Sequence, residues 1–237
     1  MTTSYIIPAF NEELLLEDTL ISLKEACTQL EIPFEIIVVN DNSTDQTEAI
    51  ALKNEVKVIT VDLHNIAGVR NAGADIATGD LLCFIDADTL VNQNTLQAMH
   101  TAIKEGIIGG GAKLQMDANT PRWGKFWTWW FTQIYFRLKF AAGCYVFATR
   151  DAFDKAGGFD DTYFAAEEVF LSKKLKKLGP FKILSQSVTT SGRKMRLHGR
   201  WQTIKHIFSI MRYGLNSRKG LDLWYDGQRE TSKQSKK

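Results

Sequence analysis

The chain has 237 residues, of which 44% are apolar and 24% are charged. This ordinary globular composition excludes collagen, coiled coil and wholesale disorder, and the length suits a single domain. No apolar run approaches the roughly 20 residues of a bilayer-spanning helix, and the first residues show no signal peptide. The three cysteines make neither a zinc cluster nor a disulfide framework, so we expect a cytoplasmic protein.

The net charge of +2 hides a strong asymmetry between the two halves of the chain. Residues 1–120 hold 6 Lys and Arg against 18 Asp and Glu, a net charge of −12, whereas residues 121–237 hold 23 against 9, a net charge of +14. An acidic half that faces a basic half predicts either a site for a metal and an anion between them, or a basic face for an acidic surface.

Strands and helices alternate in the first half of the chain. The segments FEIIVV (34–39) and LLCFI (81–85) are apolar on both faces, which is typical of strands covered by helices on both sides. The expected elements are a strand at 4–8, a helix at 13–30, a strand at 34–39, a helix at 44–53, a strand at 56–61, a helix at 67–77, a strand at 81–85 and a helix at 93–105. This alternation predicts an α/β open sandwich, with a mainly parallel central sheet flanked by helices.

The second half of the chain gives a less regular pattern, from which we expect a C-terminal helical region. The expected elements are a strand at 143–149, a turn-rich element at 153–159, a helix at 167–178, a helix at 201–215 and a disordered tail at 231–237.

Polar residues follow three of the predicted strands. They are Asn11 and Glu12 after the first strand, residues 40–45 after the second, and Asp86 with Asp88 after the fourth. Ligands bind at the carboxyl ends of strands in such sheets, so these residues are candidates for a site. Asp45 has an equally good explanation in the first turn of the following helix, where an acidic residue is favoured.

Asp86 and Asp88 lie one residue apart, and two carboxylates this close repel each other unless a cation or hydrogen-bond donors compensate. Such a pair suits Mg²⁺ or Mn²⁺ carrying a diphosphate, because phosphate oxygens and water fill the remaining metal positions. The reaction that needs this arrangement is displacement of a nucleoside diphosphate leaving group. Asp41 would accept hydrogen bonds from a base or ribose, and Arg70 would support the diphosphate or the acidic cluster.

Five motifs follow one another along about residues 3–190. They are 7–12 (IPAFNE), 38–45 (VVNDNSTD), 68–73 (GVRNAG) with 77–80 (ATGD), 84–88 (FIDAD), and 157–160 (GGFD) with 166–171 (AEEVFL). This ordered set resembles the motifs of family-2 glycosyltransferases of the GT-A fold. The resemblance implies one GT-A domain over 1–230, with a nucleotide-sugar half at 1–120 and an acceptor half at 121–230.

The resemblance also assigns roles to individual residues of the first half. It implies that Asp41 contacts the base, that Asp86 binds the ribose or sugar, and that Asp88 binds the metal. The residues that would line the nucleotide-sugar pocket with them are Pro8, Ala9, Phe10, Glu12 and Arg70.

Glu167 and Glu168 stand where the family carries a Glu-Asp pair, so Glu168 takes the place of the catalytic Asp. A base must remove the proton of an acceptor hydroxyl as that oxygen attacks the anomeric carbon. Glu168 keeps the carboxylate but is longer by one methylene, so Glu167 remains an alternative base. Both residues also fit a solvated helix start, where acidic residues are favoured.

His198 lies in a basic segment, and the resemblance offers it as a further metal ligand, with a surface histidine as the alternative. The Gln-x-x-Arg-Trp motif of processive polymer synthases is broken here, because Leu197 stands where the Gln would be. The cationic side chains of this segment form a cluster that would close over a diphosphate or remain a solvated face; they are Arg193, Lys194, Arg196 and Arg200.

Residues 123–140 contain four Trp, four Phe and one Tyr, together with Lys and Arg and no acidic residue. Core packing is the default for aromatics at helical spacing. Nine aromatics in eighteen residues exceed what one helix face buries, however, and Trp with Lys and Arg is typical of interfacial helices. We therefore weigh three alternatives: core packing, peripheral contact with the inner face of the membrane, and an apolar groove for a lipid-linked acceptor.

The sequence thus predicts a metal-dependent, inverting glycosyltransferase that moves a sugar from a UDP- or GDP-linked donor to a glycan, lipid-linked or small-molecule acceptor, as in cell-envelope glycan or glycolipid synthesis. Nucleotidyl transfer is one alternative, although the loop after the first strand lacks the glycines expected of a phosphate loop. A non-catalytic membrane- or anion-binding module is another. We expect no nucleic-acid partner.

Overall fold

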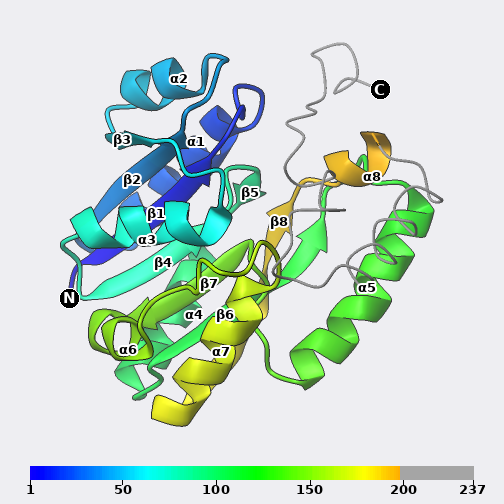
Figure 1. The fold of residues 1–237 in the computed structure, drawn as a ribbon. Helices are drawn as coiled ribbons and strands as arrows, with labels where there is room; N and C mark the ends of the chain where they lie inside the picture. The colour runs from blue at the N-terminus through cyan, green and yellow to red at the C-terminus, as the bar shows by residue number, and fades with distance from the viewer. Residues whose placement is uncertain (198–237) are drawn as a thin grey trace.

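The computed structural model describes residues 1–197, which form one large sheet with helices on both of its faces (Figure 1). The strands are Thr3–Ala9 (β1), Phe34–Asp41 (β2), Lys57–Val61 (β3), Leu81–Ile85 (β4), Thr89–Leu90 (β5), Gly109–Met116 (β6), Tyr145–Thr149 (β7) and Phe181–Thr190 (β8). The helices are Leu16–Thr28 (α1), Thr47–Lys53 (α2), Ile66–Ile76 (α3), Gln93–Lys104 (α4), Arg122–Arg137 (α5), Arg150–Ala156 (α6), Glu167–Leu178 (α7) and Arg193–Leu197 (α8). The predicted helix at 201–215 and the predicted tail at 231–237 lie outside the described residues.

The strand order across the sheet is β3-β2-β1-β4-β7-β6-β8-β5. The four strands from β3 to β4 are all parallel to one another, as expected for the nucleotide-sugar half. Strand β7 runs antiparallel to both β4 and β6, whereas β6 and β8 pair in parallel. The sheet is therefore parallel on one side and mixed on the other.

Alternating side chains of the central strands feed two separate hydrophobic clusters. In β4, Cys83 and Ile85 pack with helices α1 and α4, whereas Leu82 and Phe84 pack with α3, α6 and α7 on the opposite face. All four side chains are fully buried. The apolar character that the sequence shows on both faces of this strand is thus explained by helices on both sides of the sheet.

Three elements that follow α4 differ from expectation. Strands β6 and β8 were not predicted, and with β7, which matches the strand expected at 143–149, they show that residues 121–197 contribute strands to the sheet as well as helices. The segment expected to be turn-rich begins as helix α6 and turns only at Gly157 and Gly158, whose φ angles are 70° and 64°.

The neighbouring strands β2, β1 and β4 end at the same edge of the sheet, because they are parallel and in register. The polar residues that follow them therefore gather along this edge. The loops after β1 and β2 are tied together there, since the Asn11 N–H donates to Ser43 Oγ over 3.0 Å and the Thr44 N–H donates to Asn11 Oδ1 over 2.8 Å. In the part of the chain described here, no helix combines the length and apolar character needed to cross a bilayer.

Candidate active site

The turn after β4 presents Asp86 and Asp88 at the edge of the sheet. The Asp86 N–H donates to the Cys144 carbonyl over 3.3 Å, and the Thr89 N–H donates to the Asp86 carbonyl over 3.0 Å. Helix α1 supports the same turn, because Thr19 Oγ1 donates to the Ala87 carbonyl over 2.9 Å. These contacts fix the backbone from which both carboxylates project.

Arg70 of α3 joins the carboxylates of two distant segments. Its guanidinium donates from Nη2 to Asp86 Oδ1 over 2.8 Å and from Nη1 to Glu167 Oε1. Nη2 also donates to the Gly143 carbonyl over 2.9 Å, and the Phe159 ring centroid lies 5.2 Å from the guanidinium carbon. The side chain is 2% exposed, so one buried cation holds the strand end at Asp86 and the start of α7 together.

Glu168, the next residue on α7, has a different environment. Tyr135 of α5 donates its hydroxyl proton to Glu168 Oε1 over 2.7 Å. Burial and the neighbouring Glu167 carboxylate raise the pKa of Glu168 to about 7, although Tyr135 and Arg70 favour the ionised form. Burial raises the pKa of Asp86 too, and the nearby Asp88 adds to this rise while Arg70 opposes it.

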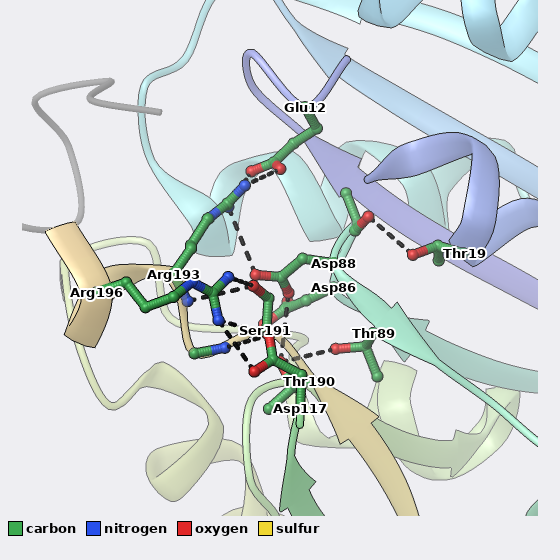
Figure 2. A network of polar contacts seen from close by, with 12 residues as sticks. Glu12, Thr19, Asp86, Asp88, Thr89, Asp117, Thr190, Ser191, Arg193 and Arg196 are labelled. Atoms are coloured by element: carbon green, nitrogen blue, oxygen red, sulfur yellow. Dashed lines mark hydrogen bonds and ion pairs between the residues drawn. The ribbon is translucent and has the colours of Figure 1, made fainter. Parts of the chain in front are cut away.

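Arg193 of α8 reaches from the second half of the chain to the ends of β1 and β4 (Figure 2). Its guanidinium forms a two-pronged ion pair with the Glu12 carboxylate and lies 3.5 Å from Asp88 Oδ2. The end of β8 adds further contacts to Asp88, because the Ser191 N–H donates to its carbonyl over 3.2 Å. Arg193 thus supplies positive charge beside Asp88, where the sequence predicts a metal and a diphosphate.

Asp117, which the sequence analysis did not single out, binds the same segment. Its carboxylate accepts from Arg196 Nη1 over 2.8 Å and from the Gly192 N–H over 3.0 Å. Arg196 and these hydrogen bonds lower the pKa of Asp117, although burial acts against them. A hollow beside Asp88 is lined by residues of this network and of α1; they are Leu15, Asp18, Thr19, Asp88, Leu90, Asp117, Asn119, Thr189, Thr190, Ser191 and Arg196.

A second part of the site lies where β1 and β2 end. Asp41 is buried, and its Oδ1 accepts from the backbone N–H groups of Leu63 and His64 over 2.8 and 3.2 Å. Phe10 packs edge-to-face against the His64 ring, with 5.4 Å between the ring centroids. Pro8 and Ala9, the last two residues of β1 before Phe10, are buried. His64 was missed because a single histidine in a loop carries no motif, and its φ of 47° is visible only in the structure.

Asp45 belongs to the helix start rather than to the site. Its Oδ1 accepts from the Thr47 N–H over 2.9 Å, and its Oδ2 accepts from the Glu13 N–H over 3.1 Å. Of the two explanations that the sequence allowed, the structure favours the helix start, although α2 begins at Thr47, so Asp45 precedes the helix by two residues instead of lying in its first turn.

The donor set around the turn after β4 fits a divalent metal in its chemistry. Asp86 and Asp88 offer two carboxylates from one turn, which is what Mg²⁺ or Mn²⁺ takes when phosphate oxygens and water complete its shell. Within residues 1–197 no three His, Cys, Asp or Glu side chains gather as a complete ligand set. His198, the other predicted ligand, lies outside the described residues, as does Arg200 of the predicted basic cluster.

Comparison with known proteins shows the family. The family model described as glycosyl transferase family 2 matches residues 4–155. Validoxylamine A glucosyltransferase of Streptomyces hygroscopicus subsp. jinggangensis is 35% identical over 105 residues, which cover 42% of this chain and 25% of that protein. The poly(ribitol-phosphate) β-N-acetylglucosaminyltransferase TarS of Staphylococcus aureus is 34% identical over 112 residues, which cover 44% of this chain and 19% of TarS. The aligned region thus spans a quarter or less of these relatives.

Solved structures extend the likeness over most of the fold. The crystal structure of residues 1–349 of S. aureus TarS in complex with UDP-GlcNAc superposes with a TM-score of 0.65 at 19% identity, covering 89% of this chain and 66% of that one. The mannosyltransferase PcManGT of Pyrobaculum calidifontis, in complex with GDP-Man and Mn²⁺, superposes with a TM-score of 0.63 at 17% identity, covering 89% and 60%. These likenesses confirm the GT-A fold class. The family match, which covers more than half of its residues, shows that this chain belongs to glycosyltransferase family 2.

Proposed function

We propose that the protein transfers a sugar from a UDP- or GDP-linked donor to an acceptor hydroxyl, with inversion at the anomeric carbon. The observation that carries this proposal is the Arg70 bridge, which brings the donor-side Asp86 and the acceptor-side Glu167 onto one buried guanidinium. Donor carboxylates and a candidate base thereby lie at one site, although they come from strand β4 and helix α7.

The donor would lie along the sheet edge from β2 to β4. Phe10, Asp41 and His64 offer a ring face and polar groups for the nucleotide base. Arg193 connects Glu12, at the end of β1, to Asp88, because its guanidinium contacts both carboxylates. A divalent metal, held by Asp88 with Asp86 nearby, would neutralise the charge of the departing diphosphate. The UDP-GlcNAc and GDP-Man complexes of TarS and PcManGT, and the Mn²⁺ of the latter, support this assignment.

Glu168 is the better candidate for the base. The carboxylate of Glu167 is already engaged by the Arg70 guanidinium, which it holds beside Asp86. Glu168 has a pKa of about 7, so at neutral pH it is substantially ionised and still basic enough to accept a proton. As the acceptor oxygen bonds to the anomeric carbon, its proton passes to Glu168, and the bond to the diphosphate breaks on the opposite face.

The acceptor side favours a lipid-linked hydroxyl among the glycan, lipid-linked and small-molecule candidates. Helix α5 places Tyr135 on Glu168 and leaves large aromatic side chains exposed on its other faces. TarS is named for the transfer of N-acetylglucosamine to poly(ribitol-phosphate), which supports a role in the synthesis of cell-envelope glycans or glycolipids.

A screen of nucleotide sugars tests the proposal. UDP-glucose, UDP-GlcNAc and GDP-mannose are incubated with the protein and Mn²⁺, with and without a lipid extract, and release of the nucleoside diphosphate is measured. We expect metal-dependent release from one donor, which Glu168→Gln lowers by roughly a hundredfold or more. The exposed Glu105→Gln is the matched control and should match the wild type. Release from no donor, or full release by Glu168→Gln, would contradict the proposal.

A further inference from the structure

Helix α5 carries an exposed aromatic face. Phe126, Trp127, Trp129 and Trp130 are exposed by 58%, 52%, 59% and 48%, and Leu138 just beyond the helix is exposed by 55%. Core packing, one of the alternatives for this segment, is therefore excluded for these five side chains. Isolated apolar residues on a surface are ordinary, but four large aromatics within five positions form a contiguous patch.

The two faces of α5 have different surroundings: one packs against the protein and the other is exposed. At about 3.6 residues per turn, Phe126 and Trp130 lie on the face opposite Gly124 and Tyr135. Gly124 is buried, and Tyr135 is half-buried with its hydroxyl on Glu168. One face of α5 thus belongs to the candidate active site, and the other presents indole and phenyl rings to the surroundings.

Basic side chains frame this aromatic face. Residues 118–150 contain no Asp or Glu, whereas the exposed cations along and just after α5 are Arg122, Lys125, Arg137 and Lys139. Aromatic rings surrounded by long cationic side chains are typical of helices that lie at the boundary between lipid tails and head groups.

Helix α7 adds lysines to the C-terminal end of α5, a contribution that the sequence did not reveal. Lys176 Nζ donates to the Leu138 carbonyl over 2.9 Å and lies 4.2 Å from the Phe140 ring centroid. Lys173 lies 5.9 Å from the same ring, and both Lys173 and Lys177 are exposed. The acidic residues of α7 are Glu167 and Glu168, at the opposite end of the helix.

We propose that the α5–α7 surface, made of the exposed aromatics of α5 and the lysines of α7 that adjoin its C-terminal end, docks on a lipid bilayer with anionic head groups. The aromatic rings enter the head-group region and the lysines meet the lipid phosphates. Because α5 is about 10 Å across, this orientation brings Glu168 within one helix diameter of the lipid surface. The inference deepens the proposed function by naming the surface that would deliver a lipid-linked acceptor.

Sedimentation with vesicles tests the docking without any transfer reaction. The full chain is mixed with vesicles of phosphatidylcholine alone or mixed with phosphatidylglycerol. We expect binding to the mixed vesicles that weakens as salt is raised. Trp127→Ser/Trp129→Ser/Trp130→Ser should lower the partition coefficient by roughly tenfold or more. Lys173→Gln/Lys177→Gln should lower it roughly 25-fold, since each lysine near an anionic surface is worth about a factor of five.

Matched controls separate docking from general stickiness and charge. Leu52→Ser removes an exposed apolar residue of α2, and Lys53→Gln/Lys104→Gln removes two exposed lysines of α2 and α4, outside the α5–α7 surface; both should bind like the wild type. The proposal is overturned if the lysine and tryptophan variants bind as the wild type does, if no vesicle is bound, or if the face instead mediates self-association that the tryptophan variant abolishes. Asp88→Asn should dock normally, so failure of the transferase proposal and failure of the docking proposal are distinguishable.

Discussion

The carboxyl of Glu168 is surrounded by groups that pull its pKa in opposite directions. Burial and the Glu167 carboxylate favour the protonated form, whereas the Tyr135 hydroxyl and the Arg70 guanidinium favour the ionised form, and the balance gives a pKa of about 7. Cys144 also faces this region, but burial raises the pKa of its thiol so far that it stays neutral. A base with this pKa changes its ionisation within the neutral range.

We predict that the pH profile of the transferase reports this residue. A base must be ionised to accept a proton, so kcat/KM should rise with pH until about 7 and then level off. Tyr135→Phe keeps the ring, which packs edge-to-face on Phe140, but loses the hydrogen bond that favours the carboxylate. Its rise should therefore move to higher pH, and activity at high pH should recover towards the wild-type value.

The control for this profile is Tyr163→Phe, which removes a hydroxyl from a ring stacked on Phe170 and should leave the profile unchanged. A Tyr135→Phe profile that is uniformly lowered without any displacement would show that the hydroxyl does not act on the base.

The sequence predicts the position of a site residue where that residue directly follows a strand. Asp86 and Asp88 come directly after an apolar strand, so their place at the sheet edge follows from the parallel topology. Arg70 and Glu167 are 97 positions apart, and no local pattern reveals that their side chains meet. Tyr135 is one of nine aromatics in 123–140, and the sequence does not show which of them face the site and which face outward.

At the scale of elements, one of the strands that were missed, β6, has weak strand character. Strand β6 begins with three glycines, which have low strand propensity and no side chain to bury. The structure explains them: a Cβ on Gly110 would lie 2.0 Å from the Lys182 carbonyl oxygen and 2.6 Å from Phe147 Cζ. The close approach of β6 to β7 and β8 therefore requires glycine at position 110.

Gly110→Ala should destabilise the protein by roughly 1–3 kcal/mol, because the added methyl group meets backbone on β8 that cannot move without separating the strands. Urea unfolding followed by circular dichroism measures this change. Gly68→Ala in helix α3 is the control: its Cβ would find the nearest atom, Leu63 Cδ1, at 3.4 Å. This substitution should be neutral or stabilise by up to about 1 kcal/mol, given the helix propensity of alanine. Equal midpoints for the two variants would refute the close-approach explanation.

At the scale of the whole molecule, the charge asymmetry of the sequence has a structural counterpart. Carboxylates of the first half meet guanidinium groups of α8 at the sheet edge, where Arg193 pairs with Glu12 and Arg196 pairs with Asp117. Further basic side chains of the described second half lie on α5 and α7. Both explanations that the sequence allowed, an anion site between the halves and a basic face, therefore have residues in the structure to support them.

The account as a whole depends on the claim that the carboxylates after β4 help to hold a nucleoside diphosphate. Calorimetric titration of UDP and GDP into the protein, with and without Mn²⁺, tests this claim most directly. We predict that the wild type binds at least one of the two only when Mn²⁺ is present, that Asp88→Asn weakens this binding by roughly tenfold or more, and that the exposed Asp75→Asn binds like the wild type. Binding that is independent of Mn²⁺ and of Asp88, or no binding of either nucleotide to the wild type, would contradict the account.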